Sequence, residues 1–239
     1  MAGLTVLVDQ VAYLRETIQS PDPEPLTAAL LAESAGADGI GVYLREDHLP
    51  IRERDVRLLR QAVHSRLILF MAATSEMVGL ALDVKPERVV LMPRMRDDGS
   101  VDYRFDVVSE SKVIYETVDT LQSNGISVGV SIEPEPDQVK TVHQMRANWV
   151  HLYAGRLRSA ATAAAQTQAL SRIIDSVKMA NRLRMHIAVG HGLDQKVIKL
   201  FAGVHEIDEF SMGRHLIARA VLVGMDRAVR DMTELIRSL

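Results

Sequence analysis

The 239-residue chain is 47% hydrophobic and 25% charged, carries a net charge of −3 and contains no cysteine. These values are ordinary for a globular protein, and they provide no basic field that would attract nucleic acid or an anionic membrane. The lack of cysteine excludes disulfides and thiolate chemistry and fits a reducing cytoplasm, where we expect the protein to act. We expect neither a membrane span nor a signal peptide, because no apolar run is long enough and the first residues lack a basic segment.

Eight short apolar runs recur along the chain and predict eight buried strands. Each run is too short for a helix and lacks the polar alternation of a half-exposed strand, a pattern typical of strands buried on both faces. The predicted strands are Thr5–Val8, Gly39–Leu44, Leu67–Met71, Arg88–Met92, Ile126–Ile132, Trp149–Leu152, Met185–Val189 and Ile207–Ser211.

Longer amphipathic segments separate these runs and predict helices. Pro25–Gly36 shows the pattern clearly, since it opens on a proline and stops at a glycine. The other predicted helices are Arg52–His64, Ser75–Lys85, Asp106–Asn124, Asp137–Arg146, Thr162–Leu183, Asp194–Phe201 and Gly213–Leu239.

Regular alternation of strand and helix predicts an α/β fold, a (β/α)₈ TIM barrel forming a single domain over residues 1–239. A doubly wound open sheet is the competing interpretation, because the pattern does not reveal whether the sheet closes. The longest irregular stretch, Pro93–Arg104, follows the fourth strand. A loop of this kind is typical of a lid over an active site, and equally of an ordinary solvated connection.

Glycine turns follow both the seventh and the eighth predicted strands, within Val189–Leu193 and Met212–Arg214. Loops at these two places commonly hold phosphate in TIM barrels, because glycines let backbone N–H groups approach an anion at a helix N-terminus. We therefore expect Gly192, Gly213 and Arg214 to bind the phosphate of a small-molecule ligand. The alternative is that the glycines only form tight turns.

Polar residues at other strand ends are candidates for catalysis or binding. His191 interrupts a glycine turn, and we expect it to transfer protons. Asp9 and Glu133 are candidate acid–base carboxylates or salt-bridge partners, and Arg45 is a candidate for a second anion or for local ion pairs. For His151 we expect a structural hydrogen bond. No spacing of histidines and carboxylates is typical of a metal site, so we expect no metal.

Several blocks occur in a specific order along almost the whole chain. They are Val8-Asp9 with Leu14-Arg15, Ala32–Ile40, Leu44–Asp47, Arg54–Arg60, Gly190–Leu193 and Ala218–Val221. In this order they resemble the pyridoxine 5′-phosphate synthase family. The resemblance implies a homo-oligomeric TIM-barrel transferase that condenses 1-deoxy-D-xylulose 5-phosphate with 3-amino-2-oxopropyl phosphate without metal or organic cofactor. It also implies that Asp9, Arg15 and Arg45 contact substrate and that His191 is catalytic.

Other positions depart from the pattern of that family. Phe70 occupies the place of its third-strand glutamate, Tyr43 that of its second-strand histidine, and Arg214 that of a histidine after the eighth strand. Each positioned acid or base typically contributes about 10²–10⁴ in rate. Phe70 can transfer no proton, and tyrosine, with a reference pKa of about 10, is a poor base near neutral pH.

Three hypotheses for the function remain open. In the first, the chain is a binder, regulator or partner subunit in which the condensation is lost or altered. In the second, it performs related chemistry on a similar phosphorylated substrate with a different set of residues, namely His191, Glu133, His151 and Tyr153. In the third, it is an active synthase in which a residue such as His48 substitutes. In each case the partner is a phosphorylated small molecule. We also expect a homo-oligomer, because part of the apolar faces of Thr162–Leu183 and Gly213–Leu239 is available for an interface.

Overall fold

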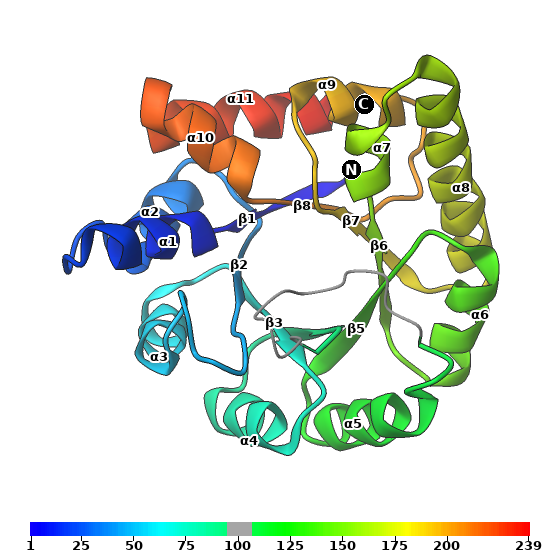
Figure 1. Cartoon of the computed structure of the whole chain (residues 1–239), viewed down its shortest axis with the longest axis horizontal. Coiled ribbons are helices and arrows are strands. Elements are labelled where there is room, and N and C mark those ends of the chain that lie inside the picture. Colours follow the sequence, from blue (N-terminus) through cyan, green and yellow to red (C-terminus); the bar gives the residue numbers. More distant parts are fainter. Residues whose placement is uncertain (95–106) are drawn as a thin grey trace.

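The computed structural model describes residues 1–94 and 107–239. Eight parallel strands pair in chain order, and β1 pairs with both β2 and β8, so the sheet closes into a barrel (Figure 1). Closure confirms the TIM-barrel prediction and rules out the open sheet. The strands are β1 Gly3–Leu7, β2 Gly39–Tyr43, β3 Arg66–Ala72, β4 Arg88–Met92, β5 Ser127–Ile132, β6 Trp149–Tyr153, β7 His186–Gly190 and β8 Glu209–Met212.

Helices surround the barrel and cover the outer face of the sheet (Figure 1). Within the described residues, none of them is both long and apolar enough to cross a membrane. They are α1 Asp9–Ile18, α2 Pro25–Ser34, α3 Glu53–Ala62, α4 Ser75–Val84, α5 Ser111–Ser123, α6 Pro136–Gln144, α7 Gly155–Ser159, α8 Ala163–Arg182, α9 Gln195–Ile198, the 3₁₀ turn η1 Lys199–Phe201, α10 Arg214–Val223 and α11 Met225–Arg237.

Three helical features differ from the prediction. Helix α1 was not predicted, because its buried side includes Asp9 and Arg15 and therefore shows little apolar periodicity. Helix α7 has only five residues, too few for a periodic signal. The predicted helix Gly213–Leu239 is wrong as one piece: it divides into α10 and α11 at Gly224, whose φ of 84° does not fit a right-handed helix. Of the predicted loop Pro93–Arg104, residues 95–104 lie outside the described part.

A buried ion pair fills part of the barrel interior. Arg88 of β4 donates from Nη2 to Oε1 of Glu209 on β8, and the two residues are 4% and 0% exposed. The Arg88 guanidinium also lies 4.0 Å from the ring centroid of Trp149. Because both charges are removed from water, each depends on the other for its stability.

We predict that Glu209→Gln lowers the free energy of unfolding by about 3–5 kcal/mol, because it leaves the Arg88 charge buried without its partner. Chemical denaturation measures the change. The control is Asp137→Asn, which removes the exposed ion pair between Asp137 and Lys140 and is expected to cost less than about 1 kcal/mol. Equal effects of the two substitutions would contradict the prediction.

Candidate functional site

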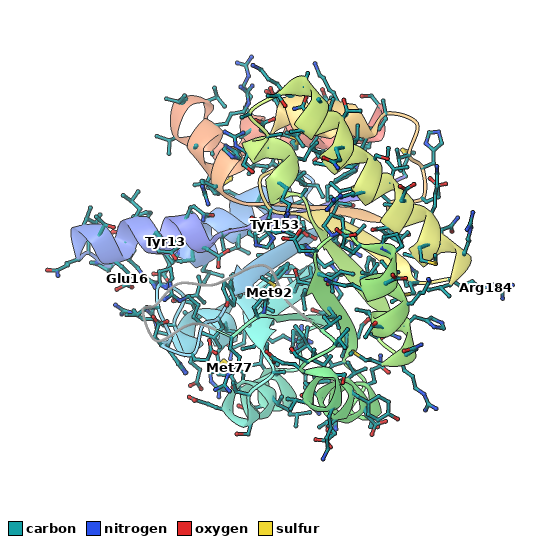
Figure 2. All side chains as sticks on the ribbon, turned by 45° about the vertical axis from the view of Figure 1, so that its right-hand side comes forward. Tyr13, Glu16, Met77, Met92, Tyr153 and Arg184 are labelled. Carbon is teal, nitrogen blue, oxygen red and sulfur yellow. The ribbon has the colours of Figure 1, made fainter. Side chains whose placement is uncertain are left out.

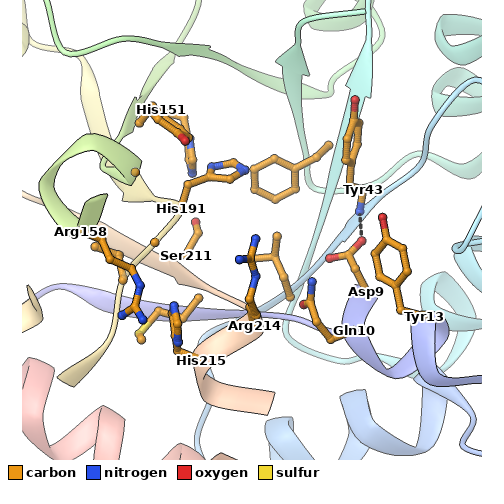
Figure 3. A pocket seen from close by; sticks show the side chains of 18 of the residues that line it. Asp9, Gln10, Tyr13, Tyr43, His151, Arg158, His191, Ser211, Arg214 and His215 are labelled. Atoms are coloured by element: carbon orange, nitrogen blue, oxygen red, sulfur yellow. Dashed lines mark hydrogen bonds between the residues drawn. The ribbon is translucent and has the colours of Figure 1, made fainter. Parts of the chain in front are cut away.

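A cavity of about 720 Å³ opens at the C-terminal ends of the strands. Its lining includes residues at or just after the ends of β1, β2, β6, β7 and β8 (Figure 3). Among the predicted site residues, the structure brings six to this cavity: Asp9, Arg45, His191, Gly192, Gly213 and Arg214. The cavity therefore lies where TIM-barrel enzymes carry their active sites.

One corner of the cavity, here called the anion corner after its expected ligand, contains Gly192, Gly213 and Arg214. Gly192 has a φ of 70°, a conformation that side chains rarely adopt. Gly213 packs closely, since a Cβ there would lie 2.9 Å from Gln10 Oε1. Helix α10 begins at Arg214, so the positive end of its dipole lies at the cavity. The start of α10, the Arg214 side chain and the two glycines thus lie in one corner.

Two further basic residues line this corner, and the sequence did not reveal them. Arg158 projects from α7 and His215 from the first turn of α10, on the same side as Arg214 (Figure 3). Arg158 is paired with Asp194, the residue that caps α9. Because α7 is too short to predict, nothing in the sequence placed Arg158 beside the glycine turns.

The His191 side chain lies between the anion corner and the cavity floor. The backbone φ of His191 is 64°. The centroid of its ring lies 5.3 Å from the centroid of the Tyr153 ring and 5.8 Å from the centroid of the His151 ring. Burial, assisted by the positive charge of Arg214, lowers the pKa of His191 to about 4. The imidazole is therefore neutral near pH 7, a state in which one ring nitrogen donates a hydrogen bond and the other accepts one.

Asp9 lies on the opposite wall of the cavity, as the first residue of α1. Its Oδ1 accepts a hydrogen bond from the Tyr43 backbone N–H at 2.6 Å (Figure 3). Burial raises the pKa of Asp9 to about 7, and the Tyr43 N–H opposes this shift. Nearby, Arg45 donates to Asp47 at 2.9 Å and lies 3.4 Å from the Tyr13 hydroxyl. Asp9 can thus exchange a proton near neutral pH.

Three predicted site residues do not line the cavity as it is formed by the described residues. Arg15 makes two hydrogen bonds, of 2.9 and 2.7 Å, to Asp55 and is 3% exposed, so it joins α1 to the first turn of α3. Glu133 accepts at 2.9 Å from Arg156 of α7. His48 lies 3.0 Å from Glu76. In this chain their positions are those of salt-bridge partners.

The cavity wall at the end of β3 is apolar. Phe70 is 1% exposed, and its Cε2 would lie 3.1 Å from a Cβ at Gly41. Its register partner on β2 is Tyr43. The ring therefore occupies the space beside Gly41, at the place where the family resemblance implies a glutamate. In residues 1–94 and 107–239, no three histidine or carboxylate side chains gather in the way that a metal site requires.

Comparison with known proteins identifies the family. The family model "Pyridoxal phosphate biosynthesis protein PdxJ" matches residues 4–238. The chain belongs to the PdxJ family. It is 45% identical over 239 residues to pyridoxine 5′-phosphate synthase of Desulforapulum autotrophicum, covering 100% of both chains. It is 44% identical over 236 residues to the protein of that name from Thermosynechococcus vestitus, covering 99% of each.

Solved structures with similar folds are more distant in sequence. A putative fructose-1,6-biphosphate aldolase from Coccidioides immitis aligns with a TM-score of 0.64 at 15% identity, over 99% of this PdxJ-family chain and 91% of the other. KGPDC from Streptococcus mutans aligns with a TM-score of 0.65 at 13% identity, over 99% of each. At these identities the likeness shows the barrel fold alone.

We predict that Asp9 makes stability depend on pH. The folded-state pKa of about 7 lies above the ordinary aspartate pKa of about 3.9, so between these values the folded chain holds a proton that the unfolded chain has lost. The contribution of Asp9 to stability is therefore full below the unfolded pKa and is lost as pH rises through the folded pKa. This contribution to the free energy of unfolding should fall by about 3 kcal/mol between about pH 5 and pH 8.

The test compares the unmodified chain with Asp9→Asn by chemical denaturation at both pH values. Asparagine carries no charge, and its oxygen still accepts from the Tyr43 N–H. We expect the variant to gain stability relative to the unmodified chain as pH rises. A constant difference between the two proteins across this range would refute the assigned shift.

Proposed function

We propose that this PdxJ-family chain binds a phosphorylated small molecule in the cavity and has lost, or greatly reduced, the condensation for which its relatives are named. The single observation that carries the proposal is the contrast between two parts of one cavity. Gly192, Gly213 and Arg214 line one corner and supply groups suited to an anion, whereas Phe70 occupies the end of β3. We place the protein in the cytoplasm on its cysteine-free composition and the biosynthetic family to which it belongs.

Proton transfer is the step that this cavity supports poorly. The condensation implied by the family requires repeated gain and loss of protons at different atoms of the substrates. His191 has a pKa of about 4 and is thus a weak base near pH 7. Phe70 has no ionisable group. Without Asp9, a single neutral imidazole cannot easily serve successive transfers at opposite ends of a substrate.

A second candidate function is an active synthase in which Asp9 has taken over the proton transfers. The observation in its favour is the Asp9 pKa of about 7, which is suited to exchange at neutral pH. Binding of ligands does not separate this candidate from the first, but turnover does.

We predict binding without turnover. At about 100 times its dissociation constant, pyridoxine 5′-phosphate is expected to stabilise the folded chain by about 2.7 kcal/mol, measured as a thermal shift. In a discontinuous assay with 1-deoxy-D-xylulose 5-phosphate and 3-amino-2-oxopropyl phosphate, the purified chain should form no pyridoxine 5′-phosphate above the uncatalysed background. Robust turnover would overturn the proposal and favour the synthase, and Asp9→Asn would then identify the group responsible.

Arg214→Leu tests the anion corner, because the substitution removes a guanidinium that lines the cavity. Leucine is a good helix former, so α10 should be retained. The thermal shift with pyridoxine 5′-phosphate should shrink. Arg227→Leu on α11 is the control, because Arg227 is exposed and does not line the cavity. Equal shifts for both variants would place the phosphate elsewhere.

We also propose that the protein self-associates through an apolar face shared by α1 and α10. Val221 and Leu222 are 75% and 83% exposed, and Leu14 and Ile18 on α1 are 47% and 53% exposed. Helix α1 projects from the side of the barrel next to α10 (Figure 1), and its far end stands clear of the other helices in Figure 2. A second copy is the proposed occupant, because the family resemblance implies homo-oligomers and such patches commonly mark contacts.

We predict that Leu222→Asp lowers the molecular mass measured by light scattering at micromolar concentration, because it places a charge in the proposed apolar contact. Val113→Asp, at an exposed position on α5, is the control and should leave the mass unchanged. A monomeric unmodified chain would remove the basis for this interface.

A further inference from the structure

The Arg158 side chain lies at the anion corner and has no role in the function proposed above. Arg158 lines the same cavity as Gly192 and Arg214, and its side chain is 42% exposed. Helix α7, which carries it, packs against the glycine turn after β7: a Cβ at Gly192 would lie 3.2 Å from Gly155 Cα and 3.5 Å from Arg158 Cβ. The Arg158 side chain therefore starts directly beside the turn at which we expect the phosphate.

Only one nitrogen of the Arg158 guanidinium has a hydrogen-bond partner within residues 1–94 and 107–239. Nη1 donates to Oδ2 of Asp194, in the ion pair that joins α7 to the start of α9. A guanidinium carries five N–H donors in a planar fork, an arrangement that suits the oxygens of a phosphate group. Because Arg158 is partly exposed and lines the cavity, its remaining donors are accessible to a ligand there.

Asp194 has other partners and does not depend on Arg158. Its Oδ1 accepts hydrogen bonds from the backbone N–H groups of Lys196 at 2.8 Å and Val197 at 2.9 Å, and these bonds cap α9. The ion pair itself is partly exposed, so water screens both charges and the attraction between them is weak. Arg158 can therefore leave Asp194 for a more highly charged anion while α9 stays capped.

Positive charge exceeds negative charge around this corner. Burial lowers the pKa of His215, the charge of Arg158 adds to this shift, Asp194 opposes it, and Arg214 adds to it again. His215 thus lies within the field of both guanidiniums, and all three side chains are on the same side of the cavity in Figure 3. Asp194 offsets only one of the two arginine charges. A phosphate group carries a charge close to −2 near pH 7 and would offset both.

We propose that Arg158 is a ligand-contacting residue that leaves Asp194 and binds the phosphate group of the ligand, so that Asp194 competes with the ligand for the guanidinium. The inference rests on the proposed function, since it adds a contact to the same phosphate. Arg158 lies outside the sequence blocks that resemble the pyridoxine 5′-phosphate synthase family, so the resemblance does not imply this contact.

The experiment measures dissociation constants by calorimetry for inorganic phosphate and for pyridoxine 5′-phosphate. Arg158→Leu removes the guanidinium and should weaken binding of both ligands about tenfold, the effect of one lost hydrogen bond to a charged group. Asp194→Asn removes the competing charge, and because asparagine also caps helices, α9 should be retained. This variant should tighten binding of both ligands about threefold. In the double variant the tightening should disappear, because it acts through Arg158.

The control is a second ion pair of similar exposure, formed by Arg172 and Glu135, neither of which lines the cavity. Arg172→Leu and Glu135→Gln remove the same charges as the two test variants. We expect them to change either dissociation constant by less than about twofold, because they leave the charges at the anion corner in place.

The outcomes separate this inference from the proposed function. If neither ligand binds the unmodified chain, the proposed function fails and the inference fails with it. If both bind and Arg158→Leu has no effect, the inference alone is overturned. If Arg158→Leu and Asp194→Asn both weaken binding, the ion pair only holds α7 in place, and the inference is again overturned. Should Arg158→Leu not fold, a crystal structure of the unmodified chain with inorganic phosphate decides: a phosphate oxygen within hydrogen-bond distance of Arg158 supports the contact, and a phosphate bound without it refutes the contact.

Discussion

The buried ion pair between Arg88 and Glu209, the first residues of β4 and β8, fills the barrel interior at the N-terminal ends of these strands. Closing eight parallel strands directs every second side chain into one shared space, and this chain places two opposite charges in it. Ser211, two residues further along β8, contacts this pair: its Oγ lies 3.5 Å from Glu209 Oε1. Ser211 and His151 lie above the pair and form the floor of the cavity. The site thus rests on a structural ion pair, and Arg88 also contributes to keeping His151 uncharged.

Burial acts in opposite directions on the acids and bases of this cavity, and the result is a polarised site. It raises the pKa of Asp9 toward neutrality and lowers that of His191, so both carry less charge than they would in water. Fixed positive charge remains at the N-terminus of α10 and at Arg214. A ligand with one anionic and one neutral end matches this arrangement. Acid–base catalysis matches it less well, because few groups change charge readily at pH 7.

Local patterns predicted the fold, and contacts between distant residues explain what they missed. Strands buried on both faces leave continuous apolar runs, and the glycine turns after β7 and β8 placed Gly192, Gly213 and Arg214 at the cavity. By contrast, the sequence around a charged side chain does not reveal which distant residue that side chain contacts. Arg15 finds Asp55 forty residues away, and Arg158 reaches the cavity from a helix too short to leave a periodic signal. Both the contact of Arg15 and the position of Arg158 depend on how the closed barrel brings distant segments together.

The sequence blocks that identify the family therefore carry two different kinds of information. The blocks that contain Arg15 and Asp55 contribute to the fold, because the hydrogen bonds between these two side chains hold α1 against α3. The block around Gly192 builds the anion corner. Neither kind reports on proton transfer, which depends on single side chains such as Phe70 at the end of β3. A chain can consequently match its family from end to end and keep the barrel, while a single position such as Phe70 carries a side chain that cannot transfer a proton.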